Sequence, residues 1–326
     1  TAMLIDRYSR TIDYLRISVT DRCDLRCTYC MPKGFTEFEK PKHWLSFTEI
    51  ERVVRQFAAM GTHHFRLTGG EPLLRKNIVE LVERLKSIEG VHELSLSTNA
   101  TQLEHYAHDL KRAGLDRINV SLDSLTRQGV AKITGFDAKD KVLAGLAAAK
   151  DAGFKHIKIN MVPMQGINEN EIDAVVKFCM QNHFILRLIE LMPMGVTAQN
   201  HQYINLQPII TRLSQELDLI PSARQYGKGP AQYWENAEGT FSMGYITPMS
   251  QHFCQSCNRV RLTVDGTLYM CLGQEQKYPL APLLKAEVDD HTLQQAIRNA
   301  INLKPLQHDF VEQPLKLIRI MSSTGG

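Results

Sequence analysis

YLRISVTDRCDLRCTYCMP, residues 14–32, joins the pattern of a short β-strand to a cluster of three cysteines. Apolar and polar residues alternate over its first six positions, which predicts a strand. Cys23, Cys27 and Cys30 follow within eight residues in a C-x3-C-x2-C spacing. In a reducing compartment, clustered cysteines of this kind indicate metal ligands or catalytic thiols rather than a disulfide framework.

Five further segments repeat the strand pattern, and amphipathic helical sequence lies between them. They begin at His64, His92, Asp116, His156 and Phe184. A glycine that can end the preceding helix stands just before four of them: Gly61, Gly90, Gly114 and Gly153. Alternating strands and helices predict a parallel sheet with right-handed crossovers. Six units are too few to close a TIM barrel, which leaves a partial (β/α)6 barrel or an open doubly wound sheet.

The first five predicted strands have one apolar face and one polar face. Parallel strands are usually apolar on both faces because both are buried. Helices would cover the apolar face here, so the polar face must line a space for water or a ligand. We expect Arg16, Arg66 and Lys158 to converge on that space. Arg187 would join them, and a polyanion such as a nucleoside triphosphate would compensate the charge. The alternative is an antiparallel sheet with one face in water.

The composition is that of an ordinary globular protein. The 326 residues suggest about two domains, which we expect to comprise residues 1–242 and 243–326. A formal net charge of +3 is too small to indicate nucleic acid binding. No apolar run approaches the roughly 18 residues of a membrane span, and the first residues carry no secretory signal. We therefore expect a cytoplasmic protein that binds neither nucleic acid nor membrane.

A second group of cysteines lies in FCQSCNRVRLTVDGTLYMCLG, residues 253–273. Its members are Cys254, Cys257 and Cys271, in a C-x2-C-x13-C spacing. Asp265-Gly266 predicts a two-residue hairpin turn that returns the third cysteine to the first two. Zinc is an alternative metal for both cysteine groups. Arg259 and Arg261 would share one strand face beside the metal, which favours a site that also binds substrate.

These motifs carry a family resemblance. The first cysteine motif, with Tyr29 before its last cysteine, resembles the signature of radical S-adenosylmethionine (SAM) enzymes. Gly69-Gly70-Glu71-Pro72, after the second strand, resembles the glycine-rich element of that superfamily. The second cysteine group, followed by N-R-V-R, and the final Gly-Gly further resemble the GTP 3′,8-cyclase family of molybdenum cofactor biosynthesis. The resemblance extends from Asp13 to Gly326.

The resemblance implies a partial (β/α)6 TIM-like barrel of the radical SAM type, with a C-terminal region that carries a second iron–sulfur cluster. Each cysteine triad would hold a [4Fe–4S] cluster with one open iron, which takes SAM in the first cluster and the guanine of GTP in the second. The implied ligands are Cys23, Cys27 and Cys30 for the first cluster and Cys254, Cys257 and Cys271 for the second. The implied SAM contacts are Tyr29, Gly70, Ser121 and Met192. The implied GTP contacts are Arg16, Arg66, Ser97, Lys158, Arg259, Val260 and Arg261.

The implied reaction converts GTP to (8S)-3′,8-cyclo-7,8-dihydroguanosine 5′-triphosphate, the first step of molybdenum cofactor biosynthesis. A 5′-deoxyadenosyl radical would remove the ribose C3′ hydrogen, and Arg16 would act in catalysis. Gly325 and Gly326 of the C-terminal tail would reach the site and help to place that arginine. The resemblance also implies a homodimer, and cyclic pyranopterin monophosphate synthase as the next enzyme; it names no electron donor.

Two other readings fit the same motifs. One is a radical SAM enzyme with an auxiliary cluster that acts on a peptide or on another nucleotide. The other is a non-enzymatic protein with two structural zinc sites. The chain departs from the family pattern at His64, Ser97 and Ala100, and none of these positions belongs to the cysteine motifs.

Overall fold

The computed structural model describes residues 3–25, 41–191, 202–223, 231–247, 258–270 and 276–305, and the structural statements below concern these residues. Their strands are β1 (Tyr14–Ser18), β2 (His64–Thr68), β3 (Glu93–Thr98), β4 (Arg117–Ser121), β5 (Lys158–Met161), β6 (Ile185–Ile189), β7 (Ile220–Pro221), β8 (Gln232–Glu235), β9 (Ser242–Ile246), β10 (Arg259–Leu262), β11 (Thr267–Tyr269) and β12 (Lys277–Pro279). They form one sheet in the order β12-β11-β10-β1-β2-β3-β4-β5-β6-β9-β8-β7. The two edge strands do not pair with each other within the described ranges, so the sheet is an open, partial barrel.

All six predicted strands form, and they pair in parallel in chain order from β1 to β6. This confirms the parallel sheet and excludes the antiparallel alternative. The four glycines predicted to end helices all have left-handed φ angles, between 93° and 103°. A residue with a Cβ atom is strained in that conformation, which is why glycine stands at these helix ends.

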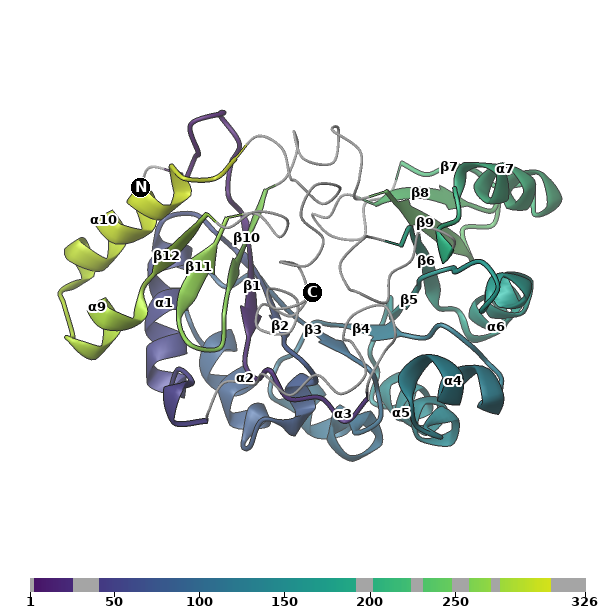
Figure 1. Cartoon of the computed structure of the whole chain (residues 1–326), viewed down its shortest axis with the longest axis horizontal. Coiled ribbons are helices and arrows are strands. Elements are labelled where there is room, and N and C mark those ends of the chain that lie inside the picture. Colours follow the sequence, from purple (N-terminus) through teal and green to yellow (C-terminus); the bar gives the residue numbers. More distant parts are fainter. Residues whose placement is uncertain are drawn as a thin grey trace.

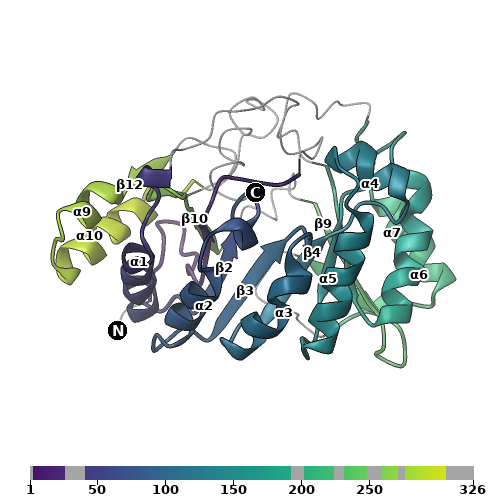
Figure 2. The same ribbon diagram turned by 90° about the horizontal axis from the view of Figure 1, so that it is seen from below.

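The helices lie outside the curved sheet. They are α1 (Phe47–Ala59), α2 (Ile78–Lys86), α3 (Leu103–Arg112), α4 (Arg127–Thr134), α5 (Lys139–Asp151), α6 (Ile172–Asn182), α7 (Gln207–Glu216), α9 (Ala281–Lys285) and α10 (Asp290–Ile301). Figure 1 shows α1 to α6 along the convex side, and Figure 2 shows them as a row in front of the strands. The concave face of the sheet is thereby left to the polar side chains of the strands.

The apolar strand faces and the helices form one hydrophobic core. Leu15, Leu67, Leu96 and Val120 are fully buried in it. Each helix contributes an apolar stripe, such as the buried residues of α1, and Ser46 begins that helix in a complete capping box with Glu49. Within the described residues, no helix is long and apolar enough to cross a membrane.

Late segments of the chain extend the barrel on both sides. β10 pairs in parallel with β1, and β9 pairs in parallel with β6. α9 and α10 pack beside α1 at the β12 edge, where Gln294 donates to Gln56 at 2.7 Å (Figure 1). The division of the chain near Ser242 remains a prediction, and this residue is the first of β9.

The hairpin between β10 and β11 differs in one detail from the prediction. Thr263 pairs with Thr267 through a backbone hydrogen bond of 2.9 Å, so three residues form the loop instead of two. Gly266 has a φ of 91° and donates its N–H to Thr263 O at 3.1 Å. The loop therefore has three residues and ends in a left-handed glycine, and an Asp-Gly pair is compatible with this loop as well as with the two-residue turn.

Candidate active site

The concave face of the sheet carries a row of arginines on three neighbouring strands. Arg16 of β1 lies opposite Arg66 of β2 on one side and opposite Arg261 of β10 on the other. Residues that pair across parallel strands point to the same face, so the three guanidinium groups share one side of the sheet. Lys158 of β5 and Arg187 of β6 approach the same group, which confirms the predicted convergence. These five residues are called the cation cluster below.

Neutral oxygen atoms hold two guanidinium groups of the cluster, those of Arg66 and Arg187. With its amide oxygen turned towards them, Asn119 accepts from Arg66 at 2.9 and 3.1 Å and from Arg187 at 3.2 Å. Arg66 Nε also donates to Ser95 Oγ at 3.1 Å, and Arg187 Nε donates to Asn160 Oδ1 at 2.7 Å. These acceptors orient the cations without adding negative charge.

Burial and mutual repulsion oppose the charges of the cation cluster. Burial, followed by the charges of Arg187 and Arg66, lowers the pKa of Lys158 to about 5. Burial, followed by the charge of Arg261, holds the pKa of Arg16 well below its usual value. Gathering cations away from water in this way is unfavourable without a counter-charge. The arrangement is therefore suited to an anionic ligand that accepts several charge-assisted hydrogen bonds.

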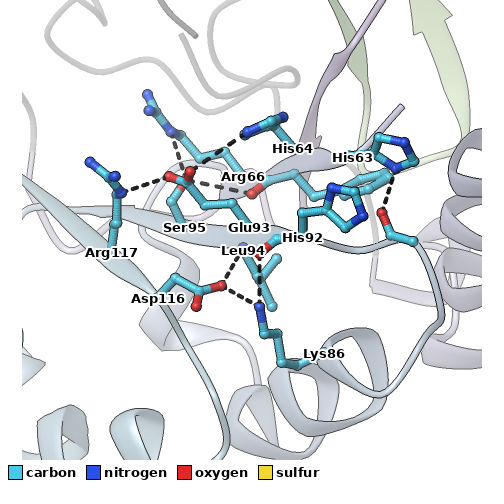
Figure 3. A network of polar contacts seen from close by, with 12 residues as sticks. His63, His64, Arg66, Lys86, His92, Glu93, Leu94, Ser95, Asp116 and Arg117 are labelled. Carbon is cyan, nitrogen blue, oxygen red and sulfur yellow. Dashed lines mark hydrogen bonds and ion pairs between the residues drawn. The ribbon is translucent and has the colours of Figure 1, made fainter. Parts of the chain in front are cut away.

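A second layer of polar residues lies towards the amino ends of the same strands. Figure 3 shows Glu93 between Arg117 and His64. The Glu93 carboxylate lies 2.9 Å from Arg117 Nε and 3.8 Å from His64 Nε2. We did not single out Glu93 or Arg117 from the sequence, although the strand alternation places both on the polar face. The carboxylate gives this layer a negative charge next to the cation cluster.

Tyr14 belongs to the same layer and contacts two arginines. Its ring centre lies 5.3 Å from Cζ of Arg66 and 4.9 Å from Cζ of Arg259. Burial would raise the pKa of the Tyr14 phenol, but Arg66, Arg259 and Arg16 together outweigh it and lower that pKa. The aromatic face supports guanidinium groups from the strands on both sides of β1. Tyr14 also has the inward parity of Arg16, so the alternation could have identified it.

The glycine-rich motif packs directly against the segment that leads to Cys23. Gly70 N–H donates to Thr20 O at 2.9 Å, and Glu71 N–H donates to Arg22 O at 2.7 Å. A Cβ atom on Gly70 would lie 2.0 Å from Arg22 O, so only glycine fits there. The contact brings the motif to the beginning of the first cysteine group, as a shared cofactor site requires. Cys23 is half-buried and is the member of that group that the structure describes.

A polar network holds this junction to the end of β3. Glu71 is fully buried and accepts from Thr98 Oγ1 at 2.6 and 2.9 Å and from Asn99 N at 2.8 Å. Burial raises the pKa of Glu71 to about 7. Asn99 Nδ2 donates to Asp24 Oδ1 at 2.8 Å, which ties β3 to the residue after Cys23. The motif, the end of β3 and the cysteine segment are thereby joined.

Ala100, one of the departures from the family pattern, has a backbone conformation that is unusual for alanine. Its φ of 65° is left-handed, a conformation that glycine adopts without strain and alanine does not. The backbone at this position therefore favours glycine over the alanine that is present. Ala100 is fully buried, so its methyl group packs in the core.

The remaining described candidates occupy different surroundings. Ser97 lies opposite Asn119, which in turn lies opposite Lys158, so Ser97 shares their row. Ser121 is exposed at the end of β4. Val260 points to the other face of β10 and is 1% exposed in the hydrophobic core, which leaves only its backbone for a substrate contact.

Other candidates lie outside the described residues. They are Cys27, Tyr29, Cys30, Met192, Cys254, Cys257, Cys271, Gly325 and Gly326. Within the described ranges, no group of three or more His, Cys, Asp or Glu side chains could hold a metal ion. The roles of these nine residues therefore remain predictions.

Two family models together match most of this chain. Residues 17–179 match the Radical SAM superfamily model, and residues 184–310 match the Molybdenum Cofactor Synthesis C model. A GTP 3′,8-cyclase of Pseudomonas putida (strain W619) is 41% identical, with 99% of this chain and 98% of the relative aligned. The chain belongs to the GTP 3′,8-cyclase family. A member from Bradyrhizobium diazoefficiens is 44% identical over 100% of this chain and 96% of its own length.

Membership establishes an enzyme of the radical SAM type that acts in molybdenum cofactor biosynthesis. It also implies one [4Fe–4S] cluster and SAM. The crystal structure of SuiB from Streptococcus suis has a TM-score of 0.63 at 16% identity, over 94% of this chain and 75% of that chain. This likeness confirms the expected fold, a radical SAM partial barrel with an additional C-terminal region.

Proposed function

We propose that this chain converts GTP to (8S)-3′,8-cyclo-7,8-dihydroguanosine 5′-triphosphate. The observation that carries the proposal is the row of Arg16, Arg66 and Arg261 on three adjacent strands, with Lys158 and Arg187 beside it. A triphosphate matches this cluster because its oxygens accept bidentate hydrogen bonds from guanidinium groups. A neutral substrate would leave the buried charges uncompensated.

The chain's own residues would fix the nucleotide at its phosphate end. Asn119 holds Arg66 and Arg187 together, and Tyr14 supports Arg66 and Arg259 from the layer below. Groups oriented before the ligand arrives lose little entropy when it binds. Ser97, in the row of Lys158, would contact the nucleotide from β3. Arg16, at the centre of the arginine row, would bind next to the reacting ribose and act in catalysis.

Cys23, Cys27 and Cys30 would hold the first [4Fe–4S] cluster, and Gly70 would allow SAM to approach it. The fit rests on the contact of Gly70 with the cysteine segment, which has no space for a side chain. Tyr29, Ser121 and Met192 would complete the SAM site. When bound, the cluster and SAM supply the 5′-deoxyadenosyl radical that removes the ribose C3′ hydrogen of GTP. The protein's part is to hold C3′ near that radical and to exclude water.

Cys254, Cys257 and Cys271 would hold a second [4Fe–4S] cluster that binds the guanine. Two of these positions adjoin the same end of one hairpin. Cys257 stands two residues before β10, and Cys271 stands two residues after β11. Because the two strands are antiparallel, the start of β10 and the end of β11 lie side by side, as a shared cluster requires. Arg259 and Arg261 leave this end of the hairpin towards the substrate.

The rival radical enzyme would act on a peptide or on another nucleotide. SuiB has been crystallised bound to the precursor peptide SuiA, but it resembles this chain in fold alone, at 16% identity. The cation cluster favours a triphosphate over a peptide because a peptide backbone carries no comparable charge. The other alternative is zinc in both cysteine groups. Family membership disfavours zinc in the first group, because it implies a [4Fe–4S] cluster there.

A reconstituted, reduced sample tests the proposal. Under anaerobic conditions we expect about eight irons per chain, SAM cleavage to 5′-deoxyadenosine, and consumption of GTP. Guanosine in place of GTP is the matched control, because it has the same base and ribose without the phosphates. SAM cleavage that leaves GTP intact would contradict the proposed substrate.

Three further features are proposed from the family alone. They are a homodimer, a cytoplasmic location, and transfer of the product to cyclic pyranopterin monophosphate synthase. The mass of the purified protein in solution checks the first.

A further inference from the structure

Asn99, the residue after β3, directs its side-chain amide at Cys23. Its Nδ2 atom lies 3.7 Å from Cys23 Sγ and 2.8 Å from Asp24 Oδ1. A side-chain amide has two hydrogens, so Asn99 can donate one to the sulfur and the other to the carboxylate. The same sulfur accepts from the backbone N–H of Leu25 at 3.4 Å. One donor from the cysteine segment and one from the end of β3 therefore meet at the Cys23 sulfur atom.

The orientation of this amide is fixed by two further hydrogen bonds. Asn99 N–H donates to the buried Glu71 carboxylate at 2.8 Å, and Asn99 Oδ1 accepts from Thr101 N–H at 3.0 Å. Because Oδ1 accepts from a backbone N–H, the amide nitrogen is the atom that faces Cys23. Glu71 belongs to the glycine-rich motif, so this motif reaches the first cysteine group through Asn99.

The loop that follows β3 also encloses the side chain of Asp24. Thr101 Oγ1 donates to Asp24 Oδ2, and Gln102 Nε2 donates to the same oxygen at 3.5 Å. Together with the bond from Asn99, these contacts tie one carboxylate to three residues of the loop. Asp24 therefore already anchors the cysteine segment to the loop, and the bond from Asn99 to the sulfur is additional to this anchor.

A hydrogen bond to a cysteine sulfur has a chemical effect when that sulfur binds iron. A thiolate ligand carries negative charge, which a donor N–H stabilises. An electron added to a [4Fe–4S] cluster increases the negative charge on its ligands, so a donor to the sulfur favours the reduced cluster and raises its reduction potential. The nearby Asp24 carboxylate has the opposite effect, and the Asn99 amide donates to both groups.

We propose that Asn99 is a positioning residue of the first cluster. It donates to the Cys23 thiolate and thereby raises the reduction potential of the cluster. The inference rests on the proposed role of Cys23 as a ligand of that cluster. It extends the site from the cysteines to the end of β3, and it gives Glu71 the task of orienting Asn99.

The test compares Asn99→Leu, Asn99→Asp and Thr101→Val. Leucine has nearly the shape of asparagine but no donor, and aspartate replaces the donor with a negative charge. Thr101→Val is the matched control, because it removes the hydroxyl bonds to Asp24 and to Asn99 Oδ1 but keeps the backbone bond that orients the amide. Each variant is made in a parent chain whose second cysteine group is replaced by alanine, so that any cluster measured is the first one.

After anaerobic reconstitution the parent chain should hold about four irons. We expect Asn99→Leu to make reduction of the cluster roughly tenfold less favourable, which lowers the midpoint potential by about 59 mV. Asn99→Asp should lower it further, and Thr101→Val should stay close to the parent. A midpoint in Asn99→Leu that equals or exceeds that of the parent would overturn the inference. An equal fall in Thr101→Val would also overturn it, because the loop and not the donor would then set the potential.

A labelling experiment needs no variant that binds iron. The parent chain is prepared with ¹⁵N in the side-chain amides of asparagine, and the reduced cluster is examined by pulsed electron paramagnetic resonance. We expect a ¹⁵N hyperfine coupling from an amide at hydrogen-bonding distance, and its absence from the parent would overturn the inference. Absence of iron from the parent, or about four irons with an unchanged spectrum in Cys23→Ala, would instead refute the ligand role of Cys23 and the inference with it.

Discussion

Replacing Lys158 with methionine should abolish the proton uptake that accompanies GTP binding. Burial, followed by the charges of Arg187 and Arg66, lowers the pKa of Lys158 to about 5, so the lysine is almost entirely neutral at pH 7.5 in the empty site. Charging it at that pH costs roughly 3 kcal/mol, because one pKa unit corresponds to about 1.36 kcal/mol. A phosphate charge at about 4 Å returns about 4 kcal/mol at an effective dielectric constant of about 20. The net gain is less than about 1 kcal/mol, which leaves part of the bound lysine neutral, so binding should take up about 0.7 proton at pH 7.5.

The difference between the energy that the phosphate returns and the cost of charging Lys158 gives the pH dependence of the affinity for GTP. Lys158 contributes less than about 1 kcal/mol at pH 7.5, so Lys158→Met should weaken GTP binding roughly three- to fourfold there. At pH 6.5 the cost of charging falls to about 2 kcal/mol, and the loss should reach roughly thirtyfold. The quantity to follow is the ratio of the wild-type affinity to the Lys158→Met affinity at each pH, because protonation of GTP itself affects both proteins alike.

Isothermal titration calorimetry in Hepes and in Tris measures the proton directly, since the two buffers differ in ionisation enthalpy. The exposed Lys155 provides the matched control, as Lys155→Met changes a lysine outside the cluster in the segment before β5. At pH 7.5 we expect an uptake of about 0.7 proton in the wild type and the control and almost none in Lys158→Met. Equal uptake in all three proteins, or an affinity ratio independent of pH, would refute the reasoning.

Three further substitutions test other parts of the site. Gly70→Ala should abolish SAM binding in equilibrium dialysis, because the added Cβ would lie 2.0 Å from Arg22 O; binding at wild-type affinity would show that the contact is dispensable. Tyr14→Leu should raise KM for GTP roughly tenfold with a smaller effect on kcat, because two arginine–aromatic contacts are lost, whereas Tyr14→Phe should keep the wild-type KM. Burial raises the pKa of Glu71 to about 7, so the folded protein holds a proton that the unfolded chain releases near its ordinary value of 4.5. The free energy of unfolding of the empty protein should therefore fall by about 3 kcal/mol as the pH rises from 4.5 to above 7, and urea unfolding of Glu71→Gln should lack this decrease. Parallel pH profiles for the two proteins would argue against a buried, titrating Glu71.

The strand pattern predicted the core and the cation cluster for the same reason. A period of two places Arg16 and Arg66 on the face opposite Leu15 and Leu67, whatever the rest of the chain does. The pairing order of β1 to β6 followed because helical sequence between strands requires parallel crossovers. Local sequence was sufficient for both.

Long-range pairing could not be predicted in this way. β10 lies beside β1 although more than 200 residues separate them, and nothing in either strand specifies the partner. The hairpin loop was one residue longer than predicted, since Asp-Gly is compatible with both turns. In the sequence, Asn119 is one of several polar residues on the predicted strands. Its contact with Arg66 and Arg187 in the structure places it in the site.

The fate of the ribose 3′ hydrogen tests the central claim most directly. Reduced, reconstituted protein is given SAM and GTP that carries deuterium at C3′, and the 5′-deoxyadenosine is examined by mass spectrometry. The account predicts one deuterium atom in each molecule of 5′-deoxyadenosine formed, with an equal amount of GTP consumed. Unlabelled 5′-deoxyadenosine, formed while GTP remains intact, would contradict it.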